Sequence, residues 1–294
     1  MLGWRLILSL MLSLALIGLF AADAWTGSKA PILWALASLL AVRSTWELVQ
    51  LFRVRFDPNF RLLACLAVAV VSANWLVPIF ADEAPATAAR DLAPPMLAYE
   101  FSVMALFVGG MIRFRAPGKT IEMLGSELVA LSYVALFISL TVQLRWIDAE
   151  KLGYLPLASL VLATKSGDIA AYTAGRLLGK AKLCPLISPG KTWAGAIGAL
   201  CGSAAASWAF FRWATGWLTG AQPGPWYAAV FYGLCLGLVG LTGDLAESLL
   251  KRDVGQKDSA ALLPGFGGLL DLLDSVIFSG PVAYLLWLVL PLTG

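Results

Sequence analysis

The chain has 294 residues, 60% of them hydrophobic and only 13% charged, and its mean hydropathy is +0.80. This composition excludes an ordinary soluble domain and indicates a polytopic membrane protein. The sequence contains no histidine, which excludes Ser-His-Asp triads, His-ligated metals and imidazole acid–base catalysis. The net charge of +3 gives no sign of nucleic-acid binding. The four cysteines lack C-x-x-C spacing, so neither a disulfide framework nor a zinc site is expected.

Apolar stretches near the length of a bilayer-spanning helix recur along the chain. They predict an all-α integral membrane protein with about nine transmembrane helices, at residues 4–22, 31–52, 62–81, 96–112, 124–144, 153–175, 193–213, 226–243 and 269–291. Charged residues interrupt the second stretch (Arg43, Glu47) and the sixth (Lys165, Asp168). An alternative interpretation of the first stretch is a signal peptide, since Arg5 precedes an apolar core and Ala22 to Ala24 offer a cleavage site.

The distribution of Lys and Arg predicts the orientation of these spans, because cytoplasmic segments hold the excess of basic residues. With the N-terminus inside, the inner segments carry 14 of the 21 basic residues: Arg5, Arg53, Arg55, Arg61, Arg113, Arg115, Lys119, Arg176, Lys180, Lys182, Lys191, Lys251, Arg252 and Lys257. The sequence therefore predicts a multi-pass protein of the plasma membrane or cell inner membrane, with the N-terminus inside and the C-terminus outside.

The two halves of the chain differ in character. Residues 1–150 are expected to form about five plain spans with short loops and few intramembrane charges beyond Glu47, Glu100 and Glu127. Residues 151–294 are expected to form a catalytic transmembrane region of about four spans, because polar residues border their cytoplasmic ends in three clusters.

The first cluster is "TKSGDIAAYTAGRLLGK", residues 164–180. Lys165 and Asp168 are three residues apart, so on a helix they can pair and reduce each other's cost of burial. The alternative is that Asp168 lines a polar cavity. Tyr172, Gly175 and Gly179 continue the same face, which predicts close approach by another helix or a ligand.

The second cluster is "KLCPLISPGKTWAG", residues 182–195. Its "PGKT" is not a Walker motif, because residue 185 is proline where that motif needs glycine and no strand is expected before it. It reads as a basic cytoplasmic loop in which Ser188, Lys191 and Thr192 precede a helix N-terminus and can hold phosphate. The alternative is a loop that only sets topology.

The third cluster spans residues 243–275, "GDLAESLLKRDVGQKDSAALLPGFGGLLDLLDS". Pro264 stops a helix, and the glycines that follow allow a tight turn and close approach to a ligand. Asp271 and Asp274 begin the next helix, where carboxylates are commonly caps. Together with Asp244 they suggest Mg²⁺ held by carboxylates and substrate phosphates. The residues alone indicate a membrane-embedded, metal-dependent enzyme acting on a phosphorylated lipid.

The third cluster closely resembles the signature of the CDP-diacylglycerol synthase (phosphatidate cytidylyltransferase) family through Ser248, Lys251, Arg252, Lys257, Asp258, Pro264, Gly267, Gly268, Asp271 and Asp274. "DIAAYTAGRLLGK" and "ISPGKTWAG" are similar to two further stretches of that family. The resemblance implies that CMP is transferred from CTP to phosphatidate, giving CDP-diacylglycerol and pyrophosphate in phospholipid biosynthesis.

Site residues follow by position from this resemblance. It implies Mg²⁺ at Asp244, Asp271 and Asp274, and phosphate binding by Lys191, Lys251, Arg252 and Lys257. Further substrate-binding candidates are Asp168, Ser188, Thr192, Ser248, Asp258, Gly267 and Gly268. CTP, phosphatidate and the bilayer are the expected partners, whereas a monovalent cation and a homodimer remain open alternatives.

Four positions depart from the family. Members of the family usually have His where this chain has Phe266 and Arg where it has Leu272. They usually have Lys in place of Gly190 and Glu in place of Ala194. A divergent or inactive relative acting on another lipid phosphate is therefore an alternative. A transporter is a further alternative, in which Lys165, Asp168 and Asp244 would mark an ion path.

Overall fold

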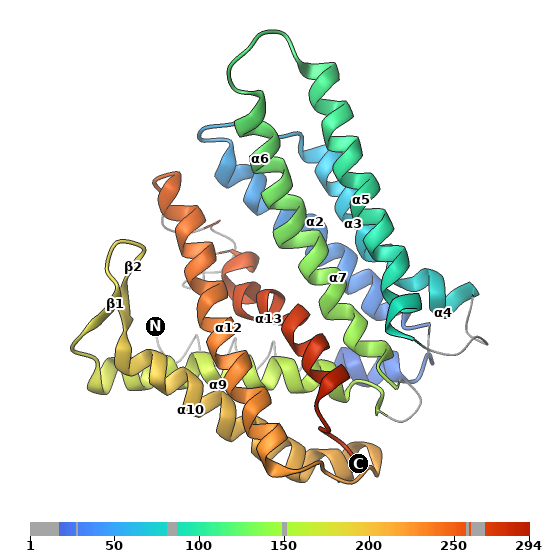
Figure 1. The fold of residues 1–294 in the computed structure, drawn as a ribbon, viewed down its shortest axis with the longest axis vertical. Coiled ribbons are helices and arrows are strands. Elements are labelled where there is room, and N and C mark those ends of the chain that lie inside the picture. Colours follow the sequence, from blue (N-terminus) through green and yellow to red (C-terminus); the bar gives the residue numbers. More distant parts are fainter. Residues whose placement is uncertain (1–17, 28, 81–86, 149–151, 257–258, 260–267) are drawn as a thin grey trace. The chain divides into compact units, whose positions relative to one another are not determined.

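A computed structural model describes residues 18–27, 29–80, 87–148, 152–256, 259 and 268–294. The chain forms two compact units (Figure 1): residues 1–143 with 258–272, and residues 144–257 with 273–294. Helix α13 (Leu269–Val289) begins in the first unit and continues in the second. Each unit is described here by itself.

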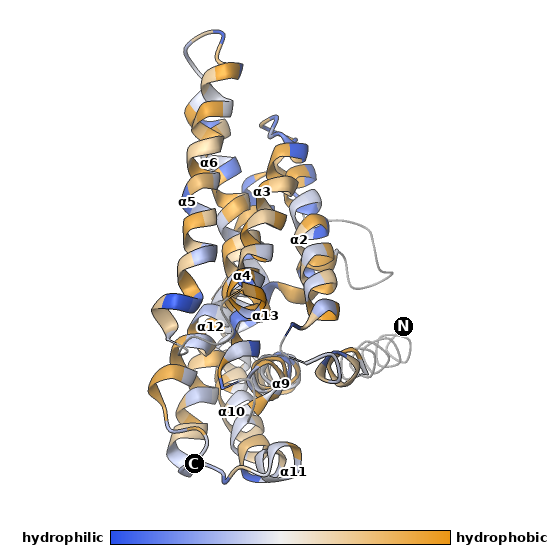
Figure 2. Cartoon of the chain, turned by 90° about the vertical axis from the view of Figure 1, so that its right-hand side faces the viewer, coloured by the Kyte–Doolittle hydropathy of each residue, from blue (hydrophilic) through white to orange (hydrophobic). Residues whose placement is uncertain are grey.

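The first unit is a bundle of long helices. Its helices are α2 (Pro31–Phe52), α3 (Phe60–Ser72), η1 (Ala73–Trp75), α4 (Leu76–Phe80), α5 (Ala88–Arg113), α6 (Thr120–Ala130), η2 (Leu131–Leu136) and α7 (Phe137–Val142), followed by η3 (Gln143–Trp146) at its boundary. Apolar residues run along most of these helices (Figure 2), and α5 turns Phe101, Phe107 and Met111 outward. Such exposed apolar faces indicate contact with lipid.

Polar groups inside the first unit are paired with one another. Glu127, fully buried on α6, receives two hydrogen bonds from Arg113 at 2.9 and 2.8 Å and one from the Asn59 amide at 2.9 Å. Asp23 accepts hydrogen bonds from the amides of Ile32 and Leu33 and so caps the start of α2. These pairs stabilise charges that would otherwise be costly in a membrane.

The second unit is built on α9 (Leu155–Leu178), α10 (Trp193–Ala209), η4 (Phe210–Ala214), α11 (Thr215–Thr219), α12 (Trp226–Asp253) and the remainder of α13. Helices α9 and α10 lie side by side, and α12 packs on α10 (Figure 1). Small residues set this arrangement: a Cβ on Gly198 would stand 2.6 Å from Ala174, and one on Gly233 would stand 2.6 Å from Ala204. Close packing of small residues is the usual basis of helix association in membranes.

Seven helices of the described residues are long and apolar enough to span a membrane: 31–52, 60–80, 88–113, 120–146, 193–219, 226–253 and 269–289. The prediction of an all-α polytopic protein is therefore confirmed. The predicted first span, 4–22, lies mostly outside the described residues. The predicted sixth span is helix α9, which its polar and charged residues keep out of this set. The count of nine and the inside location of the N-terminus stay predictions.

One expectation about local structure is wrong. Residues 182–192 form a two-stranded antiparallel hairpin, β1 (Lys182–Cys184) and β2 (Ser188–Thr192), where the sequence suggested a loop with no strand before "PGKT". Strands this short carry too few residues for a period-two pattern to appear in the sequence. The hairpin fixes the backbone that leads into α10.

We predict that Gly233→Ala destabilises the second unit, because the added methyl group would meet the backbone of Ser203 and Ala204 on α10. Overpacking of this kind costs about 1–3 kcal/mol. The measurement is thermal unfolding of the purified protein in detergent. Gly125→Ala on α6 is the matched control, since a Cβ there meets nothing within 4 Å. Equal midpoints for the two variants would contradict the close approach of α10 and α12.

Candidate active site

Helix α9 carries two charged side chains, Lys165 and Asp168, one helical turn apart. The Lys165 ammonium lies 2.9 Å from Asp168 Oδ2, so the pairing predicted from their spacing is confirmed. Lys165 also donates to Ser275 Oγ of α13 at 2.9 Å, and Ser275 Oγ donates to Asp168 Oδ2 at 2.9 Å. The three side chains thus tie α9 to α13.

The hairpin and the start of α10 contribute the residues predicted to hold phosphate. Thr192 ends β2 and caps α10, because its Oγ1 accepts a hydrogen bond from the Gly195 amide at 3.1 Å. A Cβ on Gly175 would stand 3.2 Å from Thr192 Oγ1, so the predicted close approach along the small face of α9 is confirmed. An amide-rich helix N-terminus beside a basic strand favours anions.

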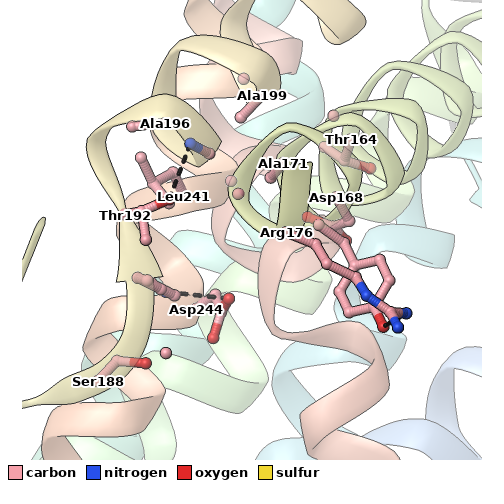
Figure 3. A pocket seen from close by; sticks show the side chains of 18 of the residues that line it. Thr164, Asp168, Ala171, Arg176, Ser188, Thr192, Ala196, Ala199, Leu241 and Asp244 are labelled. Atoms are coloured by element: carbon pink, nitrogen blue, oxygen red, sulfur yellow. Dashed lines mark hydrogen bonds and ion pairs between the residues drawn. The ribbon is translucent and has the colours of Figure 1, made fainter. Parts of the chain in front are cut away.

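Helix α12 places an acid opposite the strand β2. Asp244 Oδ2 lies 2.9 Å from Lys191 Nζ, and Figure 3 shows its carboxylate directed toward that strand. A Cβ on Gly243 would stand 2.6 Å from Phe278 and 3.0 Å from the Asp274 carbonyl oxygen, so α12 and α13 lie close together here. Asp274, only 5% exposed, accepts a hydrogen bond from the Ser275 amide and interacts electrostatically with Asp244, Lys165 and Asp168.

A cavity of about 470 Å³ lies between these elements of the second unit (Figure 3). Its polar lining includes Asp168, Arg176, Ser188, Lys191, Thr192 and Asp244, and its apolar lining includes Ala171, Ala196, Ala199, Leu236 and Leu241. Both interpretations of Asp168 are therefore correct, because it pairs with Lys165 and also lines a cavity. A mixed lining of this size suits a ligand with a charged end and an apolar or aromatic body.

Three predicted site residues on α12 do not line this cavity. Ser248 and Lys251 are buried, and Lys251 Nζ lies 3.4 Å from Glu247 Oε1. Arg252 is exposed and donates to the carbonyl oxygens of Ile187 at 3.3 Å and Gln256 at 2.9 Å. Arg252 therefore contacts the turn of the hairpin that carries Ser188 and Lys191.

Asp271 lies in the first unit, at the N-terminus of α13. Its Oδ2 accepts hydrogen bonds from the Gly268 amide at 2.7 Å, the Ser259 amide at 3.2 Å and Ser259 Oγ at 2.8 Å. The bond from Gly268 is the backward half of a capping box. The capping interpretation of Asp271 is thus confirmed, and its predicted role as a metal ligand stays a prediction.

The fully buried Glu47 of α2 completes the same cap. Its two carboxylate oxygens accept hydrogen bonds from the amides of Leu269 at 2.9 Å and Leu270 at 2.8 Å, and Arg43 pairs with it at 3.0 Å. A side chain at Gly268 would collide with Glu47 and Ser259, which explains the glycine. The sequence showed Glu47 only as an interruption of an apolar stretch.

Some predicted residues lie outside the described part of the chain: Lys257, Asp258, Gly267, and Phe266 with its departure from the family pattern. Sequence reasoning also missed Ser275 and left Lys165 and Arg176 out of the site. An intramembrane charge was the available signal for Lys165. No local pattern distinguishes Ser275 from other serines in apolar helices. In the described residues, no three His, Cys, Asp or Glu side chains form a ready-made metal site.

A helical membrane unit that gathers lysine, hydroxyls and carboxylates around a cavity indicates a protein that handles phosphorylated ligands. Comparison with known proteins agrees with this class: the chain belongs to the cytidylyltransferase family, whose model matches residues 5–290.

Three bacterial proteins named phosphatidate cytidylyltransferase are similar to the chain. The Brucella suis protein is 45% identical over 139 residues, which are 46% of this chain and 48% of that protein. The Mycobacterium leprae protein is 44% identical over 133 residues, which are 45% of this chain and 40% of that protein. The Chlamydia trachomatis protein is 29% identical over 271 residues, which are 89% of this chain and 85% of that protein. The chain thus spans about half the length of the Brucella relative that it matches.

We predict that Glu47→Gln loosens the first turn of α13, because the amide replaces one of two acceptor oxygens and removes the charge that faces the helix N-terminus. Loss of a cap costs about 0.5–2 kcal/mol. Hydrogen exchange at the amides of Leu269 and Leu270 is the measurement, and it should become faster. Glu122→Gln, on an exposed turn of α6, is the control. Unchanged exchange in Glu47→Gln would contradict the capping role.

Proposed function

We propose that this chain transfers CMP from CTP to phosphatidate, giving CDP-diacylglycerol and pyrophosphate. The observation that carries the proposal is the Lys191–Asp244 pair at the cavity of the second unit, a cation suited to phosphate beside a carboxylate suited to a metal ion. Family membership and the names of the relatives support the same reaction.

The polar end of the cavity suits a triphosphate. Lys191 supplies a cation, while Ser188 and Thr192 supply hydroxyl groups beside the N-terminus of α10. Lys191 pairs with Asp244, so a phosphate that engages Lys191 would free the carboxylate. Binding of nucleotide and exposure of a metal ligand would then occur together.

The carboxylates of Asp244 and Asp274 suit Mg²⁺. This ion prefers oxygen ligands and is usually bound through one or two carboxylates together with substrate phosphates, so a cage of three acids is not required. When bound, Mg²⁺ neutralises charge on the triphosphate. Asp244 lines the cavity, and Asp274 on α13 interacts electrostatically with Asp244.

The reaction needs no strong base. An oxygen of the phosphatidate phosphate, already anionic, forms a bond to the α-phosphorus of CTP, and the bond from that phosphorus to the pyrophosphate oxygen breaks. No proton has to be removed from the nucleophile, which fits a chain with no histidine. The residues act by orienting the two phosphates and by stabilising charge.

The distribution of charge supports an orientation for the site. The excess of Lys and Arg in the predicted inner segments, which include residues 176–191, supports a site that faces the cytoplasm in a bacterial inner membrane. The lipid substrate would then approach from the bilayer and CTP from the cytoplasm.

The first test is an assay of purified protein in detergent with labelled CTP, phosphatidate and Mg²⁺. Asp244→Asn and Asp274→Asn should each lower kcat by about 10²-fold or more, as expected when charge stabilisation is lost. Asp253→Asn, at the exposed end of α12, is the control. Asp271→Asn separates the two roles of that residue, because a cap alone predicts a lower midpoint of unfolding with kcat largely retained. Absence of CDP-lipid with every lipid phosphate tried would refute the proposal.

The second test uses the departure at Gly190. This residue lines the cavity, and a Cβ there meets nothing within 4 Å. Gly190→Lys adds an ammonium near the triphosphate and should lower the KM for CTP roughly tenfold, the effect of one charge-assisted hydrogen bond. Gly190→Met is the matched control of similar length without charge. An equal KM in both variants would place the triphosphate elsewhere.

A further inference from the structure

Lys165 stands among the acids of the second unit without being one of the predicted site residues. Its ammonium lies 2.9 Å from Asp168 Oδ2 and donates to Ser275 Oγ at 2.9 Å, so α9 and α13 both hold it. Asp274 interacts electrostatically with Lys165 as well as with Asp244 and Asp168. Lys165 therefore belongs to the acid cluster, here defined as Asp168, Asp244 and Asp274.

The acid cluster needs a resident positive charge. Asp274 repels both Asp168 and Asp244, and it is almost fully buried, where an unpaired charge is most costly. Lys165 counters part of this repulsion. Asp244 has a second cation in Lys191, which the phosphate of a substrate would engage, whereas Lys165 is held by two side chains of the protein.

We propose that Lys165 is the fixed cation that sets the divalent-ion affinity of the acid cluster. The inference rests on the metal site within the proposed function. A fixed ammonium repels a divalent cation while it holds Asp168 and Ser275 in place, so it keeps binding weak until the phosphates of a nucleotide add negative charge. Metal ion and nucleotide would then bind together, and the empty site would not retain a tightly bound ion.

This role predicts that the divalent-ion affinity changes in a direction that a structural or a substrate-binding role of Lys165 does not predict. Removal of the positive charge should strengthen binding of a divalent ion in the absence of substrate. A lysine that only positions the acids would weaken that binding when replaced. A lysine that binds a phosphate of the substrate would leave it unchanged and raise a KM instead.

The experiment is a titration of the purified, full-length protein in detergent with Mn²⁺, followed by electron paramagnetic resonance of the free ion without nucleotide or lipid. Lys165→Met should lower the Kd for Mn²⁺ at least tenfold. Lys165→Arg keeps the charge, so its Kd for Mn²⁺ should stay within about threefold of that of the unchanged protein. A tenfold change in Kd would require a change of about 1.4 kcal/mol in binding free energy. Lys182→Met, on the exposed side of β1, is the matched control and should change nothing.

The outcomes separate this inference from the proposed function. An unchanged or higher Kd in Lys165→Met, in protein that elutes as a single folded species, would overturn the inference. It would also be overturned if adding Asp244→Asn or Asp274→Asn to Lys165→Met left the tighter Mn²⁺ binding intact. Tighter binding in Lys165→Met, together with no CDP-lipid synthesis by the unchanged protein, would refute the proposed reaction and leave the role of Lys165 standing. If Lys165→Met failed to fold, Lys165→Gln would be titrated in its place, with the same criterion.

Discussion

The cost of placing charge in an apolar, membrane-spanning unit governs the site of this protein. Lys165 and Asp168 interrupt the apolar sequence of helix α9, and their partial burial is tolerated because each is the other's partner and Ser275 of α13 bonds to both. The same cost makes Lys191 pair with Asp244. The charges that the proposed reaction needs are thus held in pairs, and a ligand with phosphates can exchange one partner for another.

Close helix packing is what lets these pairs form across different helices. Gly198 and Gly233 bring α10 within backbone contact of α9 and α12, and Gly243 does the same for α12 and α13. A larger side chain at Gly243 would push α13, which carries Asp274 and Ser275, away from α12. The glycines in these apolar helices therefore serve the polar site, although none of them carries any chemistry.

The sequence predicted the membrane class and most of the polar residues that line the cavity, but not the contacts that depend on distant segments. Spacing was sufficient for Lys165 and Asp168, because three residues on a helix fix their separation. It was insufficient for Ser275, whose role depends on where α13 packs, and for Glu47, which is more than 200 residues from the amides that it caps. The hairpin at 182–192 was missed because a three-residue strand has no readable period. Family resemblance supplied Lys251 and Arg252, which the structure places outside the cavity lining.

The two acids at the start of α13 show why spacing alone cannot assign a role. Asp271 and Asp274 are three residues apart, yet their surroundings differ. Asp271 accepts hydrogen bonds from the Gly268 amide and from the amide and hydroxyl of Ser259. Asp274 is buried and interacts electrostatically with Asp244, Lys165 and Asp168. A carboxylate in the first turn satisfies backbone amides that the helix leaves unpaired. One turn later those amides are already bonded within the helix, so a carboxylate needs another reason to be buried. For Asp274 that reason is the acid cluster, and the cap formed by Asp271 and Glu47 fixes the residue at which the helix carrying Asp274 begins.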